Sequence, residues 1–414
     1  MFIRSVRWIK KYLPWGIIIS IIFAGLSACA QPTQSLTQTP IKIGYSASLT
    51  GTYTDQGKAL VQGVELWRDT VNKNNGLLGH PVTLVGLDDG SNPKRVTTNY
   101  QKLINTDHVD LLFGPYSSLL TLPAAIVAHN SNYALFAPTG SAPSVLNKHF
   151  YNIFVTTLPS QLYLQSFADF ILALPQGIRP KTAAYVSVDN PFATPPVNAA
   201  KGLLAPNGLK TVFTLPQPYP ANANVSLIAE QVAHSGADIV VLGTSGLIDC
   251  VSFIKTFKQQ HYNPEAIIAT SGPNEGSSFL NQLGVGTAEG VFVTKPGWYP
   301  GANTYQNDQF TQDYLTKYGG TVQDISATTA EAYSAGQLLE QAVNKSHSLA
   351  NDKLIQEMHA DTFETLQGPT KFDASGANLL GVPFLFQWQR GALIPVYPYY
   401  QAQANPEYPK NPWS

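Results

Sequence analysis

Cysteine and charged residues are scarce in this chain of 414 residues. It holds two cysteines, Cys29 and Cys250, and 12% of its residues are Asp, Glu, Lys or Arg. The eight histidines are scattered and form no HExxH or CxxC-type cluster. We therefore expect neither a metal ion nor a cofactor. Cys250 is expected to be a small buried apolar residue, with a reactive thiol as the alternative.

An excess of basic over acidic residues is lacking beyond the first 28 residues. Those residues carry four positive charges and no negative one, so the formal net charge of -1 becomes -5 without them. No basic patch is left to hold nucleic acid, which excludes that class of partner. No later apolar segment approaches the length of a membrane span. The remaining length is enough for two domains.

Residues 1–28 have the pattern of an export signal. Four basic residues precede an apolar stretch at residues 15–26, which is too short and wrongly flanked for a spanning helix. Residues 26–29 (LSAC) resemble the lipobox of bacterial lipoproteins, in which the cysteine is acylated. We therefore expect lipid on Cys29 and a polar tether over residues 29–40. The alternative is an ordinary secretory leader that ends near a cysteine.

From residue 41 onward, short apolar strands alternate with amphipathic helices. Leu60, Val64 and Trp67 share one face of a helix that follows the strand at residues 41–46. Asn92 and Pro93 are typical of a helix start. This alternation predicts an α/β fold with a parallel, doubly wound sheet.

The same strand and helix pattern restarts after residue 160 and predicts a second sheet of similar construction. Residues 385–396 indicate a terminal hairpin. Residues 401–414 are rich in proline and asparagine, so we expect a flexible tail there.

Two loops of the first run are rich in Gly, Pro, Ser and Thr, at residues 113–118 and 136–143. Each follows a short apolar strand. In an open α/β sheet, ligands bind beyond the carboxyl ends of the strands. Backbone N–H groups, helix N-termini and hydroxyls in such loops favour a small anion such as a carboxylate.

Six segments occur in an order that resembles a known family. They are residues 41–57 (IKIGYSASLTGTYTDQG), 88–93 (DDGSNP), 114–125 (GPYSSLLTLPAA), 137–141 (APTGS), 288–293 (AEGVFV) and 368–376 (GPTKFDASG). The chain resembles the leucine/isoleucine/valine-binding protein family, the type I periplasmic solute-binding lipoproteins of ABC transporters.

This resemblance implies two doubly wound parallel-sheet lobes that are joined by a three-stranded hinge and close over a ligand. Lobe 1 would comprise residues 41–154 and 294–370. Lobe 2 would comprise residues 155–293 and 371–400.

The resemblance also implies ligand contacts where the motifs match. Ser118 and Ser141 match the residues that grip a ligand carboxylate. Ser117 would add a neighbouring hydroxyl, and Gly140 and Thr139 would offer backbone groups. Tyr53, Gln56 and Phe192 would contribute side chains from the ends of strands or nearby loops. Glu275 would be the acid that holds an ammonium group.

Each of these assignments has a structural alternative. Ser118 could cap a helix, and Ser141 could stabilise a turn. Tyr53 and Phe192 could be core or rim aromatics, and Glu275 could be a solvated loop acid. In the family, the helix that contains Glu331 often approaches the cleft. Glu331 itself is expected to be an acid on the surface of that helix.

Enzyme motifs are incomplete. Residues 51–58 (GTYTDQGK) have five residues between their glycines where a phosphate loop has four, and no Ser or Thr follows Lys58. Residues 243–247 (GTSGL) lack the second glycine of a nucleophile elbow. We therefore expect a binding protein and not an enzyme.

The predicted function is that of a lipid-anchored, extracytoplasmic receptor for a small polar solute. The solute would be an amino acid, with branched-chain amino acids among the candidates, or a related amide or carboxylate. A monomer would deliver it to an ABC permease in the membrane. The alternatives are a sensory lipoprotein that signals without transport, and a hydrolase or ligase on a similar fold.

Overall fold

The computed structural model of the protein describes residues 38–413, except for the side chains of Lys295 and Pro296. The expected signal peptide, Cys29 and most of the tether lie outside these residues. Across the described part of the chain, no helix has the length and apolar character needed to cross a membrane.

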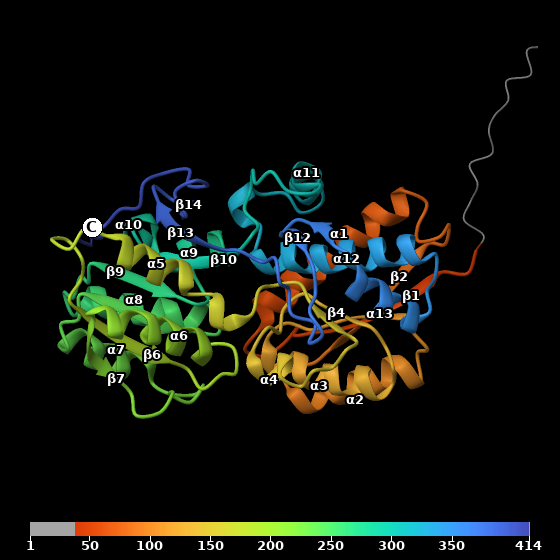
Figure 1. The fold of residues 1–414 in the computed structure, drawn as a ribbon, viewed down its shortest axis with the longest axis horizontal. Coiled ribbons are helices and arrows are strands. Elements are labelled where there is room, and N and C mark those ends of the chain that lie inside the picture. Colours follow the sequence, from red (N-terminus) through yellow and green to blue (C-terminus); the bar gives the residue numbers. More distant parts are fainter. Residues whose placement is uncertain (1–37, 414) are drawn as a thin grey trace, which may run out of the picture. The chain divides into compact units, whose positions relative to one another are not determined.

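The first sheet follows directly from the alternating pattern of the sequence. In the described part it has five parallel strands in the order β2-β1-β3-β4-β5, of which β1, β2 and β4 are labelled in Figure 1. The strands are β1 (Ile41–Ala47), β2 (Val82–Asp88), β3 (Leu111–Phe113), β4 (Leu135–Ala137) and β5 (Ile153–Val155). Its order reverses beside β1, and such a switch point is where open α/β sheets bind ligands.

Helices cover both faces of this sheet. One face packs against α1 (Thr54–Lys73), α11 (Asn307–Tyr318), α12 (Ala327–Ser346) and α13 (Asn351–Ala360). The other face packs against α2 (Pro93–Asn105), α3 (Ser118–Asn130) and α4 (Pro143–Leu146). The short elements η3 (Val322–Asp324), β11 (Phe363–Thr365) and β12 (Gly368–Thr370) complete what we call the first-sheet region.

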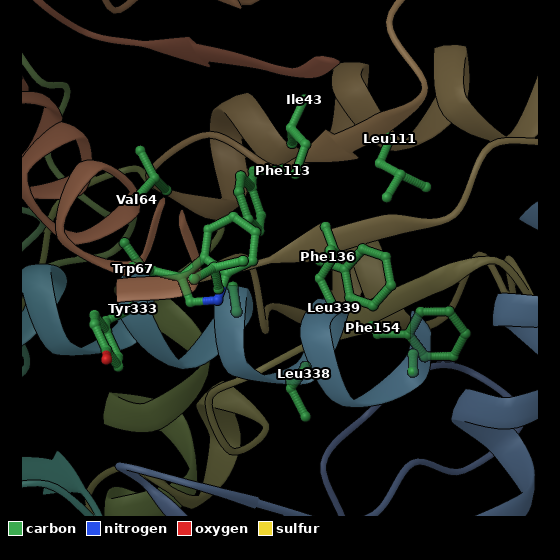
Figure 2. Packing of buried hydrophobic residues seen from close by; sticks show 14 of the residues in the cluster. Ile43, Val64, Trp67, Leu111, Phe113, Phe136, Phe154, Tyr333, Leu338 and Leu339 are labelled. Atoms are coloured by element: carbon green, nitrogen blue, oxygen red, sulfur yellow. The ribbon is translucent and has the colours of Figure 1, made fainter. Parts of the chain in front are cut away.

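Close packing of α1 against α12 fixes the position of α12. The indole of Trp67 lies edge-to-face on Phe113, with ring centroids 5.3 Å apart (Figure 2). Gly336 faces Trp67 so closely that a Cβ there would lie 2.3 Å from the indole Cγ. A Cβ on Gly63 would lie 2.3 Å from the carbonyl oxygen of Thr329. These two glycines therefore bring the helices together, and α12 carries part of the site described below.

The second sheet has seven strands in the described residues, in the order β14-β13-β10-β9-β8-β6-β7. Its first five strands along the chain are parallel, and β13 and β14 form the predicted hairpin. The strands are β6 (Thr182–Ser187), β7 (Lys210–Thr214), β8 (Ile239–Gly243), β9 (Ala266–Ala269), β10 (Phe292–Pro296), β13 (Pro383–Gln389) and β14 (Ala392–Tyr397). The two sheets confirm the predicted α/β fold.

Helices also cover both faces of the second sheet. One face packs against α5 (Gln165–Ala173) and α6 (Thr194–Leu204). The other packs against α7 (Val225–His234), α8 (Leu247–Gln259), α9 (Ser277–Leu283) and α10 (Val285–Ala288). With η1 (Ser160–Leu162) and η2 (Ala205–Asn207) they form what we call the second-sheet region. The chain passes between the two regions after β5, after β10 and after β12.

The predicted lobe boundaries fall within β5 and β10 and directly after β12. They stay a prediction, because strands at these positions do not themselves define where one lobe ends and the other begins.

The C-terminal segment differs from the expected flexible tail. Lys410 is buried, and its backbone N–H donates to the Glu265 carbonyl, with N and O 2.7 Å apart. The indole Nε1 of Trp413 donates to the Tyr262 carbonyl at 2.9 Å. The aromatic residues of the segment pack on the second-sheet region, and this apolar burial outweighs its polar composition.

Candidate ligand-binding site

A cavity lies where loops of the first-sheet region meet loops of the second-sheet region. The empty space between these loops, including the part that is open to solvent, amounts to about 570 Å³. Its lining comes from both regions: Tyr116, Ser117, Ser118, Thr139, Gly140, Ser141, Thr157, Tyr163, Asn190, Phe192, Ser245, Thr270, Ser271, Asn274, Thr294, Ala327, Thr328 and Glu331. Six of the nine predicted site residues are among them.

The loop after β3 brings Ser117 and Ser118 to the cavity. Ser117 has a φ of +75° and caps α3, with its Oγ accepting from the backbone N of Leu119 at 3.3 Å. Its own N–H donates to Thr139 Oγ1 at 2.8 Å. Ser118 is the first residue of α3, and its Oγ accepts from Ala142 N at 3.2 Å. The capping role considered for Ser118 therefore belongs to Ser117.

The loop after β4 brings Gly140 and Ser141 to the cavity. Gly140 has a φ of +112°, and a Cβ there would lie 2.5 Å from Cγ2 of Thr121. Only glycine fits this turn without strain. The hydroxyl of Ser141 is buried and has no hydrogen-bond partner in the described structure. The Ser141 hydroxyl therefore makes no hydrogen bond within the described residues that would stabilise the turn, as the alternative role requires.

Four cavity hydroxyls are buried without a partner at good hydrogen-bond geometry in the described residues, those of Ser141, Thr157, Ser271 and Thr294. The first two nevertheless lie close enough to the Tyr163 hydroxyl, and Ser271 close enough to that of Tyr116, to interact with it. Ser141 belongs to the first-sheet region and Thr157 follows β5, whereas Ser271 and Thr294 belong to the second-sheet region. A buried hydroxyl that lacks a hydrogen bond costs about 1–3 kcal/mol. A polar guest that paired with these groups would recover part of that cost.

Two tyrosines stand beside these hydroxyls. Burial and then the charge of Glu331 raise the pKa of Tyr163, while neighbouring Thr157 and Ser141 oppose the rise. Burial and then the charge of Glu275 raise the pKa of Tyr116, and Ser271 opposes it. Both phenols therefore stay neutral and can donate hydrogen bonds near neutral pH.

Among the lining residues whose side chains the structure describes, Glu331 is the one carboxylic acid. Its side chain is buried, with a residue exposure of 7%. The expectation of a helix-surface acid is therefore wrong. Every residue from 327 to 339 is buried, because this part of α12 is covered by α1, the first sheet and the cavity wall.

Tyr53 and Gln56 do not line this cavity; they line an adjoining cleft. Tyr53 is connected to the cavity through Asn190, whose Nδ2 donates to the Tyr53 hydroxyl at 3.1 Å. The same Asn190 accepts at Oδ1 from the backbone N of Phe192 at 2.8 Å. Phe192 reaches the cavity and lies edge-to-face on Tyr163, with ring centroids 5.0 Å apart.

Glu275 follows β9 and is buried beside the cavity without lining it. Its Oε1 accepts from Nδ2 of Asn274 at 3.5 Å, and Asn274 does line the cavity. Its Oε2 accepts from the Ser326 hydroxyl at 3.1 Å. The alternative of a solvated loop acid is wrong, and a direct contact of Glu275 with ligand stays a prediction.

Sequence reasoning missed several lining residues. Ser245 and Thr270 come shortly after β8 and β9, so the rule that ligands bind beyond the carboxyl ends of strands could have found them. Thr157 similarly follows β5. Tyr163 has no such signal, because it precedes a helix.

The cavity is built for binding. No cluster of three or more His, Cys, Asp or Glu side chains that could hold a metal ion occurs within residues 38–413. Hydroxyls, amides, tyrosines and one carboxylate can form hydrogen bonds and an ion pair with a small guest.

The fold, and the cavity between the first-sheet and second-sheet regions, place the chain in the class of solute-binding proteins with two α/β lobes. LivJ of Streptococcus pneumoniae in complex with isoleucine shares the fold, with a TM-score of 0.73, 16% identity, and coverage of 86% of this chain and 98% of that chain. A solute-binding protein from R. palustris in complex with 4-hydroxybenzoate has a TM-score of 0.75 and 18% identity, with coverage of 91% and 99%.

The sequence agrees with this class. The family model of the periplasmic binding proteins matches residues 40–392, and the chain belongs to this family. A Leu/Ile/Val-binding protein homolog of Brucella abortus is 25% identical over 404 aligned residues, with 92% of this chain and 96% of that protein covered. The resemblance stated from the sequence motifs is thereby confirmed.

Family membership fixes the general role of the chain. Its members are periplasmic binding proteins and not enzymes, and they act outside the cytoplasm. The chain is therefore a solute-binding protein.

Proposed function

We propose that this protein is a lipid-anchored receptor that captures an amino acid, or a related amide or carboxylate, and delivers it as a monomer to an ABC permease. The main support is the cavity, to which loops of both regions contribute buried hydroxyls. A guest held by both sides stabilises the closed arrangement over the open one, so binding drives closure.

The carboxylate end of the guest is assigned to the loops after β3 and β4. Ser118 begins α3, where free backbone N–H groups and the helix dipole favour negative charge. Ser141 offers a buried hydroxyl from the facing loop. Thr139 and Gly140 hold the two loops together and shape the space between Ser118 and Ser141.

The related structures support a carboxylate-bearing guest. Isoleucine and 4-hydroxybenzoate, which are bound by the two structural relatives described above, share a carboxylate and differ in every other polar group. The branched-chain amino acids thus remain one candidate class for this chain, beside related carboxylates and amides.

A thermal-shift screen of the purified protein over amino acids, amides and small carboxylates tests this function. A ligand at a hundred times its Kd adds about 2.7 kcal/mol to the free energy of unfolding, so the melting temperature rises. We expect at least one amino acid or amide to give such a rise. If no compound of these classes shifts the melting temperature, the proposed ligand class is wrong.

The lipid anchor is proposed from the sequence at residues 26–29. Radiolabelled palmitate supplied to expressing cells is expected to label the protein, and Cys29→Ser is expected to lose both the label and the membrane association. An unlabelled, released wild-type protein would instead support the ordinary secretory leader. A signalling role without transport stays the alternative, and a receptor that restores uptake together with its permease would argue against it.

A further inference from the structure

A hydrogen bond joins the two regions at the boundary between the cavity and the adjoining cleft. The side-chain Nδ2 of Asn190 donates to the hydroxyl of Tyr53, with the two atoms 3.1 Å apart. Asn190 lines both spaces, and Tyr53 lines the cleft. Both side chains are 5% exposed, whereas the cleft also includes the exposed residues Asp55, Asp189 and Ile248. The pair therefore lies between the cavity and a space that opens to solvent.

Tyr53 is held firmly by the first-sheet region. Its backbone N–H donates to the hydroxyl of Ser91 at 3.0 Å. Its ring lies edge-to-face on that of Tyr116, with ring centroids 5.5 Å apart. These contacts fix both ends of the residue, so its hydroxyl has a defined position relative to the first sheet.

Asn190 is held equally firmly by the second-sheet region. Its side-chain Oδ1 accepts from the backbone N of Phe192 at 2.8 Å, and its backbone carbonyl accepts from the N–H of Ala193 at 3.2 Å. Because the amide oxygen faces its own loop, the amide nitrogen is directed towards Tyr53. Both partners are thus pre-organised, and little conformational entropy is lost when they meet.

The bond to Tyr53 depends on the closed arrangement of the two regions. Its hydroxyl also lies close enough to interact with Ser245 of the second-sheet region and with Ser117 of the first-sheet region. Separation of the regions would break the contacts with Asn190 and Ser245 together. A hydrogen bond of this neutral kind shifts an equilibrium by about two- to tenfold.

We propose that Tyr53 and Asn190 form a latch between the cavity and the adjoining cleft, and that this latch sets the rate at which a bound solute leaves. This inference rests on the proposed function, because the solute occupies the cavity behind the latch. Tyr53 is a positioning residue in this role, since it acts through Asn190 and does not line the cavity. The latch holds any solute that fits the cavity and does not select among solutes.

Stopped-flow binding of isoleucine, asparagine and 4-hydroxybenzoate to Tyr53→Phe tests the latch. This variant keeps the ring and removes the hydroxyl. We expect the dissociation rate of each probe that binds to rise about two- to tenfold, while the association rate does not fall. Tyr133→Phe is the matched control, because the Tyr133 hydroxyl donates to the Val109 carbonyl at 3.0 Å within the first-sheet region. It should leave both rates unchanged.

Thermal melting of each variant without ligand checks folding. In folded Tyr53→Phe, an unchanged dissociation rate would overturn the latch. A changed order of affinities among the probes would also overturn it, because that result would indicate direct contact of Tyr53 with the solute.

A double-mutant cycle with Asn190→Ala tests whether the two residues act together. Asn190 also lines the cavity, so its replacement alone could affect the solute directly. If Tyr53 and Asn190 form the latch, the two changes remove the same bond. The dissociation rate of the double variant should then rise by less than the product of the two single increases. Increases that simply multiply would contradict the latch.

The latch can also be tested without a solute. Nitroxide labels on Lys94→Cys in α2 and Leu227→Cys in α7 report the distance between the two regions, because both positions are exposed. The full chain would carry Cys29→Ser, and Cys250 is fully buried. Pulsed electron paramagnetic resonance should show at least twice the population of longer distances when Tyr53→Phe is added.

The outcomes separate the latch from the proposed function. Unchanged label distances in Tyr53→Phe, or an equal shift in Tyr133→Phe, would overturn the latch and leave the receptor function intact. If the distances shift in Tyr53→Phe alone but none of the three probes binds the wild type, the latch is supported as a closing contact. The proposed ligand class would in that case lose its support.

Discussion

The carboxylate of Glu275 accepts a hydrogen bond from the hydroxyl of Ser326, with Oε2 and Oγ 3.1 Å apart. Glu275 follows β9 in the second-sheet region, and Ser326 caps α12 in the first-sheet region. Beside this pair, the Ser277 hydroxyl donates to the carboxylate of Asp324. Gly276 lies so close that a Cβ there would be 2.1 Å from the Gln323 carbonyl oxygen. These contacts join the two regions next to the cavity.

Glu275→Ala is expected to weaken ligand binding without changing ligand preference. Opening of the two regions would break the hydrogen bond to Ser326, so the bond favours the closed, ligand-bound arrangement. A hydrogen bond to a charged group contributes about 1.5–3 kcal/mol, and a loss of that size in binding free energy is expected. Calorimetric titration with two ligands of different affinity measures it. A changed ratio of the two affinities would instead indicate direct contact of Glu275 with ligand.

Ser118→Ala is expected to weaken the ligand by roughly 1–3 kcal/mol, because a buried carboxylate would lose a hydroxyl donor. The free protein should lose less stability, since the Ser118 hydroxyl accepts a single neutral hydrogen bond from Ala142. Ser252→Ala is the control, because the Ser252 hydroxyl bonds the Ile248 carbonyl on α8, away from the cavity. Titration of both variants gives the comparison. Equal affinities would exclude the Ser118 hydroxyl as a ligand donor.

Gly336→Ala is expected to destabilise the fold by about 1–3 kcal/mol. The added methyl would meet the indole of Trp67 at 2.3 Å, and overpacking of this kind forces helices apart. Gly202→Ala on α6 is the control, because no atom lies within 4 Å of its added methyl. In a helix, that change should be neutral or stabilising by up to about 1 kcal/mol. Urea unfolding measures both, and equal effects would contradict the packing argument.

Local sequence signals predicted much of the fold. Asn92 and Pro93 marked the start of α2, and in the structure the Asn92 side chain accepts from the N–H groups of Lys94 and Arg95. The predicted strand at residues 266–269 coincides with β9. These features depend on capping and on apolar runs, which act over a few residues.

Long-range packing limited the prediction of the site. Glu331 was expected on a helix surface, but contacts with α1, distant in sequence, bury the start of α12. The loops after β3 and β4 were found from composition and position. Tyr163 and Thr294 line the cavity because the second-sheet region contacts the first-sheet region. No local sequence pattern indicates this long-range contact.

Cys250 is expected to be unreactive in the folded protein. Its side chain is fully buried on α8, and burial raises the pKa of the thiol well above its usual range. The reactive thiolate is therefore scarce at neutral pH. In the variant Cys29→Ser, a chromogenic thiol reagent should label Cys250 only after guanidinium unfolding. Rapid labelling without denaturant would show that this part of α8 opens readily.

The buried amine of Lys410 is expected to make stability depend on pH between about 8 and 10.4. Its Nζ donates to Asn263 Oδ1 at 2.6 Å and lies over the ring of Trp413. Burial lowers the pKa of Lys410 to about 8, whereas an unfolded lysine has a pKa of about 10.4. Between these values the unfolded chain binds more protons than the folded one, so this group adds stability as the pH rises.

The variant Lys410→Met isolates this contribution, because its side chain does not titrate. The free energy of unfolding of the wild type, minus that of Lys410→Met, should increase from pH 7.5 to pH 9.5. Urea unfolding of both proteins at the two pH values measures the difference, and subtraction cancels the titration of groups that both proteins share. A difference that stays constant would mean that Lys410 keeps its proton throughout this range and that the C-terminal segment admits water around the amine.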